Sequence, residues 1–293
     1  MSSSFLQVLL SGVATGCIYG LVALSFVLIY KATETVSFMQ GELLMVGAFA
    51  VLALNVAGGW PMWLAVPGGL VAMVVFGAVL ERGVLRRAIG QPHLTAVLLT
   101  FGLGMMMRGS VTTVPAASHS MHRLDLPWAG ETLQLGPVVV ALEHVAVIGA
   151  TCALALALTL FFRRTKAGLA LRACSENPQV AALMGVSVSG MHTLAWALGA
   201  GLAACAGLLL APITFVHLNM GLIALKAFPA AVLGGMTSLP GALIAGIFLG
   251  VVEALAGLYL PEGSKDVVPY VLLMLALLLF PAGMGAGLRW SRR

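Results

Sequence analysis

The chain has 293 residues, of which 60% are hydrophobic and only 9% are charged, with a formal net charge of +5 and a mean hydropathy of +1.06. Soluble globular proteins carry about 25% charged residues, so this composition excludes an ordinary soluble domain and indicates a helical membrane protein. The excess of cations does not predict a nucleic-acid-binding protein, because the cations lie between apolar segments and not on one soluble face.

Apolar segments follow one another along the whole chain, and most reach the roughly 20 residues that a helix needs to cross the hydrocarbon core. The seventh is shorter, and its sequence KAFPAAVLGG contains Pro229 and ends at Gly234 and Gly235, which predicts a half-helix or a re-entrant segment. We therefore expect an all-α, polytopic transmembrane bundle of eight or nine membrane segments, in a single domain over residues 1–293. The segments are 5–30, 36–57, 61–81, 93–116, 137–162, 191–212, 222–237, 240–260 and 267–283.

The cations are unevenly distributed between the two sides of this bundle. When nine segments alternate in direction, the loops of one side contain only Arg123 and Lys265. Eleven of the 15 Lys and Arg residues fall on the other side, which the positive-inside rule predicts to be cytoplasmic. The N-terminus is then outside and the C-terminus is cytoplasmic. The eleven are Lys31, Arg82, Arg86, Arg87, Arg163, Arg164, Lys166, Arg172, Arg289, Arg292 and Arg293.

A face of small residues marks the first segment, where Gly12, Gly16 and Gly20 recur at four-residue spacing. Because four residues make about one helical turn, these glycines lie on one side of the helix. Small residues at this spacing let two helix backbones approach closely in lipid. We interpret them as a site of dense helix packing rather than as the contact of a specific partner.

The second segment carries Glu42 near its cytoplasmic end, with Gln40 half a turn before it. At 1.5 Å per residue, this position predicts a depth of about 9 Å for Glu42. Charges inside membranes are costly and usually face the interior of a helix bundle. Two interpretations stay open for Glu42: it lines a translocation path or orients its helix, or it makes a structural hydrogen bond to a neighbouring helix.

Two pairs of opposite charge are expected in the outer half of the bundle. Arg108 and Glu143 lie at similar depths in the fourth and fifth segments, so pairing would reduce the cost of burying both. Lys226 and Glu253 lie at corresponding positions of the seventh and eighth segments. An amino acid carries both charges, so competition between a substrate and the second pair is a further hypothesis.

The one sizeable outer loop, residues 118–137, contains His119 and His122. Two histidines are too few for a metal site of their own, and no cysteine or cluster of carboxylates accompanies them. The sequence therefore predicts no metal ion.

The longest basic segment, FFRRTKAGLALRACSENPQVAALMGVSVSGM (161–191), contains a short predicted helix. Asn177 is a good N-cap, Pro178 suits the first helical position, and Gly185 suits the left-handed residue that ends a helix. A helix of two turns is marginal on its own and needs a packing partner. The helix would either fit a groove on another protein or lie on the protein's own surface or at the membrane interface. Its apolar stripe is Val180, Leu183 and Met184.

The same segment resembles the cytoplasmic loop of the permease subunits of branched-chain amino acid ABC importers. The residues RRTKAGLALRACSENPQVAALMGVSV follow the family pattern R-T-x-x-G-x-x-x-R-A, then a polar pair, then A-x-x-x-G-[IV]. Further stretches resemble the family in chain order, so that the resemblance covers nearly the whole chain. They are SGVATGCIYGLVALSFVLIY, VSFMQGELLMVGAF, ERGVLRR, KAFPAAVLGGMTSLPGALIAGIFLGVVEAL and SKDVVPYVLLMLALLLFPAGMGA. Gln40 departs from the family, which commonly has a histidine there, so no role in proton titration is carried over to it.

The resemblance implies the importer permease fold and a translocation subunit of the bacterial inner membrane, which is not an enzyme. Its implied partners are a second, related permease chain, two cytoplasmic ATPase subunits and a periplasmic or surface solute-binding protein, but no nucleic acid. The loop 163–190 would be the coupling loop. The coupling residues would be Glu176, Asn177, Pro178, Val180, Leu183, Met184 and Gly185, and the expected path residues are Gln40, Glu42, Lys226 and Glu253.

The sequence contains no G-x-x-x-x-G-K-[ST] motif, so we expect partner subunits to bind ATP and this chain to need no cofactor. Related permeases for urea, amides or aromatic acids are alternative assignments. A stand-alone secondary transporter fits less well, because it would tend to have more carboxylates in its spans for ion coupling. No H-E-x-x-H or G-x-S-x-G motif indicates an intramembrane enzyme.

Overall fold

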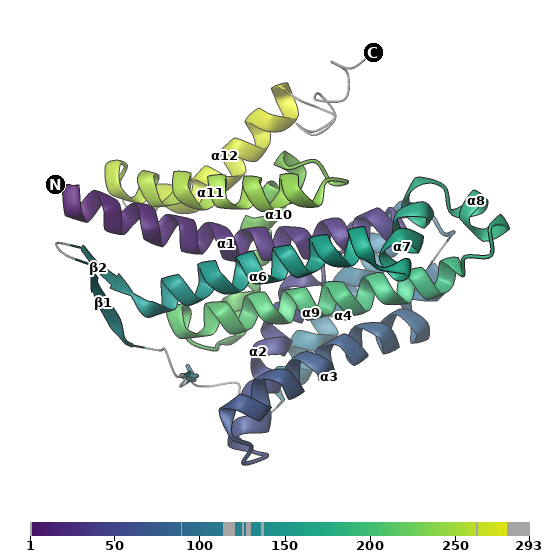
Figure 1. Ribbon diagram of the computed structural model, residues 1–293, viewed down its shortest axis with the longest axis horizontal. Helices are drawn as coiled ribbons and strands as arrows, with labels where there is room; N and C mark the ends of the chain where they lie inside the picture. Colours follow the sequence, from purple (N-terminus) through teal and green to yellow (C-terminus); the bar gives the residue numbers. More distant parts are fainter. Residues whose placement is uncertain are drawn as a thin grey trace.

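The computed structural model describes residues 2–88, 90–113, 121–124, 126, 130–135, 138–261 and 263–279. Helices make up almost all of this part of the chain, with one short β-hairpin at one end (Figure 1). The predicted all-α class is therefore confirmed. His119 and the C-terminal cations Arg289, Arg292 and Arg293 lie outside the described residues.

Each predicted apolar segment coincides with a helix. Two short 3-10 helices, η1 (Leu85–Ala88) and η2 (Leu218–Leu222), lie between these helices. The α-helices of the apolar segments are α1 (Ser2–Thr33), α2 (Gln40–Val56), α3 (Met62–Gly83), α4 (His93–Thr112), α6 (Leu142–Arg164), α9 (Val188–Thr214), α10 (Ile223–Leu233), α11 (Leu239–Tyr259) and α12 (Ser264–Leu279).

Six of the described helices are long and apolar enough to cross a membrane, namely α1, α3, α4, α6, α9 and α11. The helix α2 is shorter, with 17 residues, and α10 has only 11. An 11-residue helix is about 16 Å long, which is about half of the hydrocarbon thickness. The seventh segment therefore has the length of the half-helix that the sequence predicts.

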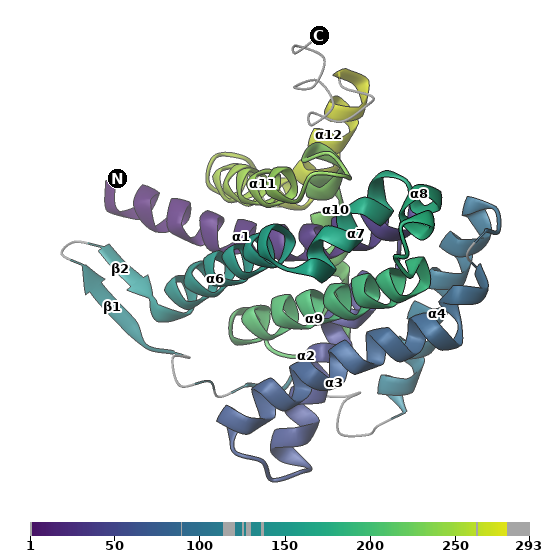
Figure 2. The same cartoon turned by 45° about the vertical axis from the view of Figure 1, so that its right-hand side comes forward.

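Helix α1 runs through the centre of the bundle, with α6, α9, α10 and α11 packed around it (Figures 1 and 2). In the described structure, 89% of the most apolar stretch of α1 is buried. The corresponding share is 28% for α3, 22% for α4 and 17% for α6. The helix α2 packs between α9 and α3, and α4 lies against α2. The hydrophobic core is therefore built around α1, and α3, α4 and α6 present apolar side chains outward.

The glycine face of α1 packs against α11, as the sequence predicts. A Cβ atom added to Gly12 would lie 2.7 Å from the Cβ of Ala254, and one added to Gly16 would lie 2.6 Å from the Cα of Ile247. Gly250 of α11 has no room for a side chain either, because the backbone of Gly16 lies directly opposite. The two helices therefore approach at a distance that only glycine allows on both sides.

A two-stranded antiparallel hairpin, β1 (Thr132–Leu135) and β2 (Val138–Ala141), precedes α6 and was not predicted. Thr132 pairs with Ala141, and Leu135 pairs with Val138. The apolar run from 137 was interpreted as the start of a membrane helix, but its first residues form this strand. The hairpin and the N-terminal end of α1 lie together at one end of the bundle, which we call the hairpin end (Figure 1).

We predict that Gly16→Ala destabilises the protein by about 1–3 kcal/mol, because the added methyl group overpacks the contact between α1 and α11. Thermal melting of the purified protein in detergent measures the effect. Gly149→Ala is the matched control, since a Cβ on Gly149 of α6 meets nothing within 4 Å. Equal melting temperatures for the two variants would contradict the close approach of α1 and α11.

Candidate functional site

Two short helices connect α6 to α9 at the end of the bundle opposite the hairpin, which we call the loop end (Figure 1). They are α7 (Lys166–Glu176) and α8 (Pro178–Leu183). The capping residues in the sequence predict α8, whereas α7 was not predicted. The sequence signal for α7 was the N-cap residue Thr165, whose side chain accepts a hydrogen bond from the Gly168 amide at 2.9 Å.

The helix α7 folds back onto the last turn of α6. Leu171 and Cys174 are each only 3% exposed, and Arg172 donates a hydrogen bond to the carbonyl oxygen of Phe162 at 2.9 Å. Gly168 lies so close to the backbone of Phe161 and Phe162 that no side chain fits there. The loop that carries α8 is therefore held against α6 by the packed helix α7.

The helix α8 begins and ends as the sequence predicts. The Asn177 side-chain oxygen accepts hydrogen bonds from the amides of Gln179 and Val180, both at 3.0 Å, and Pro178 occupies the first helical position. Gly185 follows the helix with a φ of +83°, in the left-handed region that favours glycine. Local capping chemistry therefore fixes both ends of a helix of only 6 residues.

The apolar stripe of the α8 segment is uncovered. Leu183 is 86% exposed, Met184 81% and Val180 53%, whereas Ala181 is buried and faces the protein. Packing on the protein's own described surface therefore does not occupy the stripe. Isolated exposed apolar residues are common, but these three lie together at the tip of a rigid loop.

A buried polar network holds the start of α9, immediately after this loop. Glu81 of α3 is fully buried, forms an ion pair with Arg86 at 3.1 Å and accepts a hydrogen bond from Thr193 at 2.6 Å. Arg86 also donates to Thr193 at 2.9 Å. The sequence analysis did not single out Glu81, although the spacing of Glu81 and Arg86 within ERGVLRR was a signal for it.

The helix α2 begins deep inside the bundle. Residues 36–38 before it are not helical, the amide of Phe38 donates to Thr100 in α4 at 3.3 Å, and Gly41 packs on Gly221 of η2. Gln40 and Ser37 are fully buried, and their side-chain polar atoms have no hydrogen-bond partner in the described part of the chain. The start of α2 therefore meets η2, which directly precedes the short helix α10.

Glu42 pairs with Arg108, and the predicted pair of Arg108 with Glu143 is wrong. The carboxylate of Glu42 lies 2.9 Å from the Arg108 guanidinium. Arg108 reaches Glu42 because α4 packs on α2, and Gly104 of α4 lies beside the Glu42 side chain. Glu143 is on α6, which packs on α1 instead. Glu143 instead accepts a hydrogen bond from the amide of Gly130 at 2.9 Å. Glu42 lies in the first turn of α2, which begins at Gln40 and not at residue 36.

Lys226 and Glu253 form the predicted ion pair, at 3.1 Å. Two side chains that the sequence analysis did not include join them: Tyr19 donates to Glu253 at 2.6 Å, and Asp266 contacts Lys226 at 2.5 Å. Glu253 also lines a crevice of about 750 Å³ at the hairpin end, between α1, β2 and α11, together with His144. The network thus links α1, α10, α11 and α12 beside a space that opens toward the hairpin.

Known proteins match this chain over nearly its whole length. The family model described as "Branched-chain amino acid transport system / permease component" matches residues 8–277. The high-affinity branched-chain amino acid transport system permease protein LivH of Escherichia coli (strain K12) is 33% identical over 297 residues, which cover 96% of this chain and 95% of the relative. The corresponding permease protein BraD of Pseudomonas aeruginosa is 31% identical over 294 residues, with the same two coverages.

A solved structure shares the fold. PsaBC from Streptococcus pneumoniae in complex with Fab is similar with a TM-score of 0.51 and 16% sequence identity, over 94% of this chain and 95% of that chain. The fold and the comparisons together define a multi-pass inner-membrane transport permease, a class of protein that is not an enzyme. The chain belongs to the family of branched-chain amino acid ABC transporter permeases.

We predict that Glu42→Gln destabilises the protein, because Arg108 keeps its charge in an apolar environment without a counter-charge. Breaking a buried pair costs about 3–5 kcal/mol, and the partial exposure of both side chains reduces this cost here. The double variant Glu42→Gln/Arg108→Gln should recover much of the loss in thermal melting. Glu143→Gln is the control. A loss of stability in Glu143→Gln, and none in Glu42→Gln, would restore the pairing that the sequence suggested.

Proposed function

We propose that this chain is the translocation subunit of an ATP-driven importer for branched-chain or closely related amino acids, acting as one permease domain over residues 1–293. The substrate class rests on the relatives named above, two of which are branched-chain amino acid permeases at 33% and 31% identity. In this proposal the chain supplies part of the membrane path and receives motion from a separate motor. It binds no cofactor of its own, since the partner subunits bind the ATP.

The observation that carries the proposal is the exposed stripe on the α8 segment. A capped, rigid helix with Leu183 and Met184 almost fully exposed is suited to the groove of another protein. The loop 163–190, with Glu176 and Gly185 flanking the helix, is then the coupling loop. Because α7 packs on α6 and the loop ends in α9, a displacement of α8 reaches two helices that contact α1.

The distribution of cations supports the orientation. Arg163, Arg164 and Lys166 lie at the loop end with Lys31 and Arg86, so the positive-inside rule makes this end cytoplasmic. Two ATPase subunits would then bind there, beneath this chain and a second, related permease chain. The N-terminus and the hairpin would face outside, where a periplasmic or surface solute-binding protein delivers the substrate, and the C-terminus would be cytoplasmic.

The proposed path residues form two groups. Gln40 and Glu42 lie where α2 meets η2, and Lys226 and Glu253 lie beside the crevice at the hairpin end. Interrupted helices expose backbone polar groups inside the membrane, and transporters place binding sites there. An amino acid could exchange its own charges for the Lys226–Glu253 pair as it passes. Specificity would rest mainly on the solute-binding protein, so urea, amides or aromatic acids stay alternative substrates.

Cross-linking tests the coupling helix. In a Cys152→Ser background, which removes an exposed cysteine, we expect Leu183→Cys to cross-link to an ATPase subunit in membranes that contain the whole transporter. Met121→Cys is the control, because Met121 is 70% exposed but lies in the chain segment leading to the hairpin. Normal transport without any ATPase cross-link from Leu183→Cys, using linkers of several lengths, would refute the docking of α8.

Uptake measurements test the path residues. We expect Lys226→Ala and Glu253→Ala each to lower amino acid uptake by about tenfold at equal protein level. Lys226→Ala leaves Glu253 without a counter-charge, and Glu253→Ala removes the acceptor of both Lys226 and Tyr19. The control is Lys265→Ala, which removes a neighbouring cation that makes no ion pair in the described structure. Full uptake by both path variants would remove this pair from the proposed path.

A further inference from the structure

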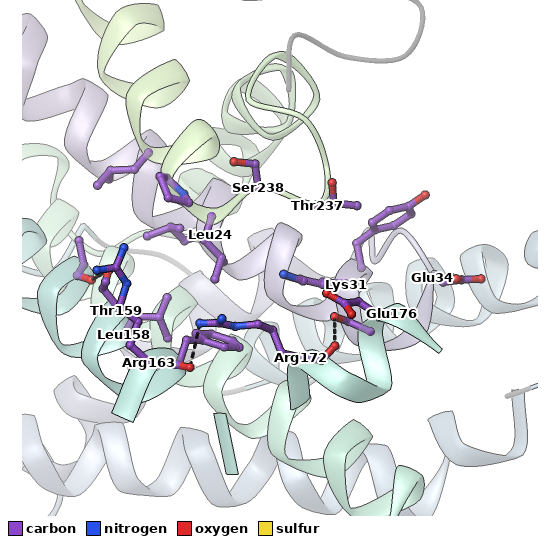
Figure 3. A pocket seen from close by; sticks show the side chains of 17 residues that line it. Leu24, Lys31, Glu34, Leu158, Thr159, Arg163, Arg172, Glu176, Thr237 and Ser238 are labelled. Atoms are coloured by element: carbon purple, nitrogen blue, oxygen red, sulfur yellow. Dashed lines mark hydrogen bonds between the residues drawn. The ribbon is translucent and has the colours of Figure 1, made fainter. Parts of the chain in front are cut away.

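A large groove opens at the loop end, separate from the α8 stripe and from the proposed path residues. It has a volume of about 1120 Å³. Helix α1 forms its floor, α6 and α11 form its two walls, and α7 closes one side (Figure 3). Helices α6 and α11 both pack on α1 but not extensively on each other, so the groove is a space between membrane helices.

Three cations from three different helices line this groove. Lys31 comes from the last turn of α1, Arg163 from the end of α6 and Arg172 from α7. Figure 3 shows Lys31 and Arg172 extending toward the middle of the groove, whereas Glu34 lies at its edge and points away. Glu176 is the second acidic residue of the lining, so the lining carries three positive and two negative side chains.

The lining of the groove contains a polar part and an apolar part. The hydroxyl group of Ser238 accepts a hydrogen bond from the Gly241 amide, so its own proton can be donated to an anion beside the cations. Thr159 and Ser175 donate theirs to the backbone carbonyl oxygens of Ala155 and Arg172. Leu24, Leu158 and Leu243 form the part that extends toward the middle of the bundle. A ligand that fits both parts has a negatively charged polar group and an apolar chain.

The outer surfaces beside the groove have the character of lipid-facing helices. On α6, Leu156 is 61% exposed and Leu160 45%, and on α11, Ile244 is 67% exposed and Phe248 51%. The groove therefore opens between two helices that present apolar side chains outward at the level of the membrane. An acyl chain can enter it sideways from the bilayer, a route that a water-soluble anion or a folded protein does not have.

We propose that this groove binds the phosphate headgroup of an anionic phospholipid, with an acyl chain along Leu24, Leu158 and Leu243. Basic pockets between membrane helices near the cytoplasmic surface recognise anionic headgroups in this way. The phosphate lies between Arg163, Arg172 and Lys31, so the lipid joins α7 to the ends of α1 and α6. This site goes beyond the proposed transport function and depends only on the chain lying in a membrane.

Native mass spectrometry of the full chain in detergent tests the site, with dioleoyl phosphatidylglycerol as the anionic probe and dioleoyl phosphatidylcholine as the zwitterionic one. We expect phosphatidylglycerol to bind more tightly. Arg163→Gln should weaken its binding about fivefold, and Arg163→Gln/Arg172→Gln about 25-fold, since each cation near anionic lipid contributes about fivefold. Arg163→Gln is the cleaner variant, because Arg172 also holds α7 to Phe162.

The matched control is Arg164→Gln, which removes the neighbouring cation that does not line the groove and should change binding by less than about twofold. Melting curves show whether each variant is folded. If the double variant is unfolded, the phosphatidylglycerol binding of Arg163→Gln alone tests the site. Equal binding of both lipids, or equal loss in Arg163→Gln and Arg164→Gln, would overturn the site. Displacement of phosphatidylglycerol by an equal concentration of inorganic phosphate would also overturn it, since the ligand would then be a free anion.

Discussion

The close contact between α1 and α11 is the constraint on which the rest of the bundle depends. Gly12, Gly16 and Gly250 remove the side chains that would keep the two backbones apart, and α1 becomes buried along most of its length. Without hydrophobic driving force inside lipid, such close packing is a main source of helix association. The helices α6, α9 and α10 pack around α1, so the loop 163–190 and the charged clusters are all placed relative to one central helix.

The loop end shows how this arrangement suits a transport subunit. Thr165 and Asn177 cap two short helices that would be marginal alone, and α7 is fixed to α6 by buried contacts. The network of Glu81, Arg86 and Thr193 fixes the start of α9 on α3. A force on the α8 segment would therefore act on α6 and α9 through packed contacts, which is what the proposed coupling role requires.

Sequence patterns were most informative where local chemistry decides the structure. Hydrophobic length located the apolar helices, six of which are long enough to cross a membrane. The four-residue spacing of glycines located the contact on α1, and Asn177 with Gly185 located α8. Contacts between distant helices were harder to predict: the partner of Arg108 depends on which helix lies beside α4, and neither depth nor spacing contains that information. The hairpin and the late start of α2 were missed because short apolar strands and apolar non-helical turns have the same composition as a helix. Tyr19 and Asp266 joined the Lys226–Glu253 pair through tertiary packing alone.

The central claim is that the α8 segment is the surface on which a separate motor acts. Hydroxyl-radical footprinting measures it directly, because Met184 is 81% exposed in the isolated chain and methionine side chains are readily oxidised. The account predicts that oxidation of Met184 falls several-fold when the chain is assembled with the ATPase subunits in an active transporter. Met184 oxidation that stays as fast in the assembled, transporting complex as in the isolated chain would contradict it.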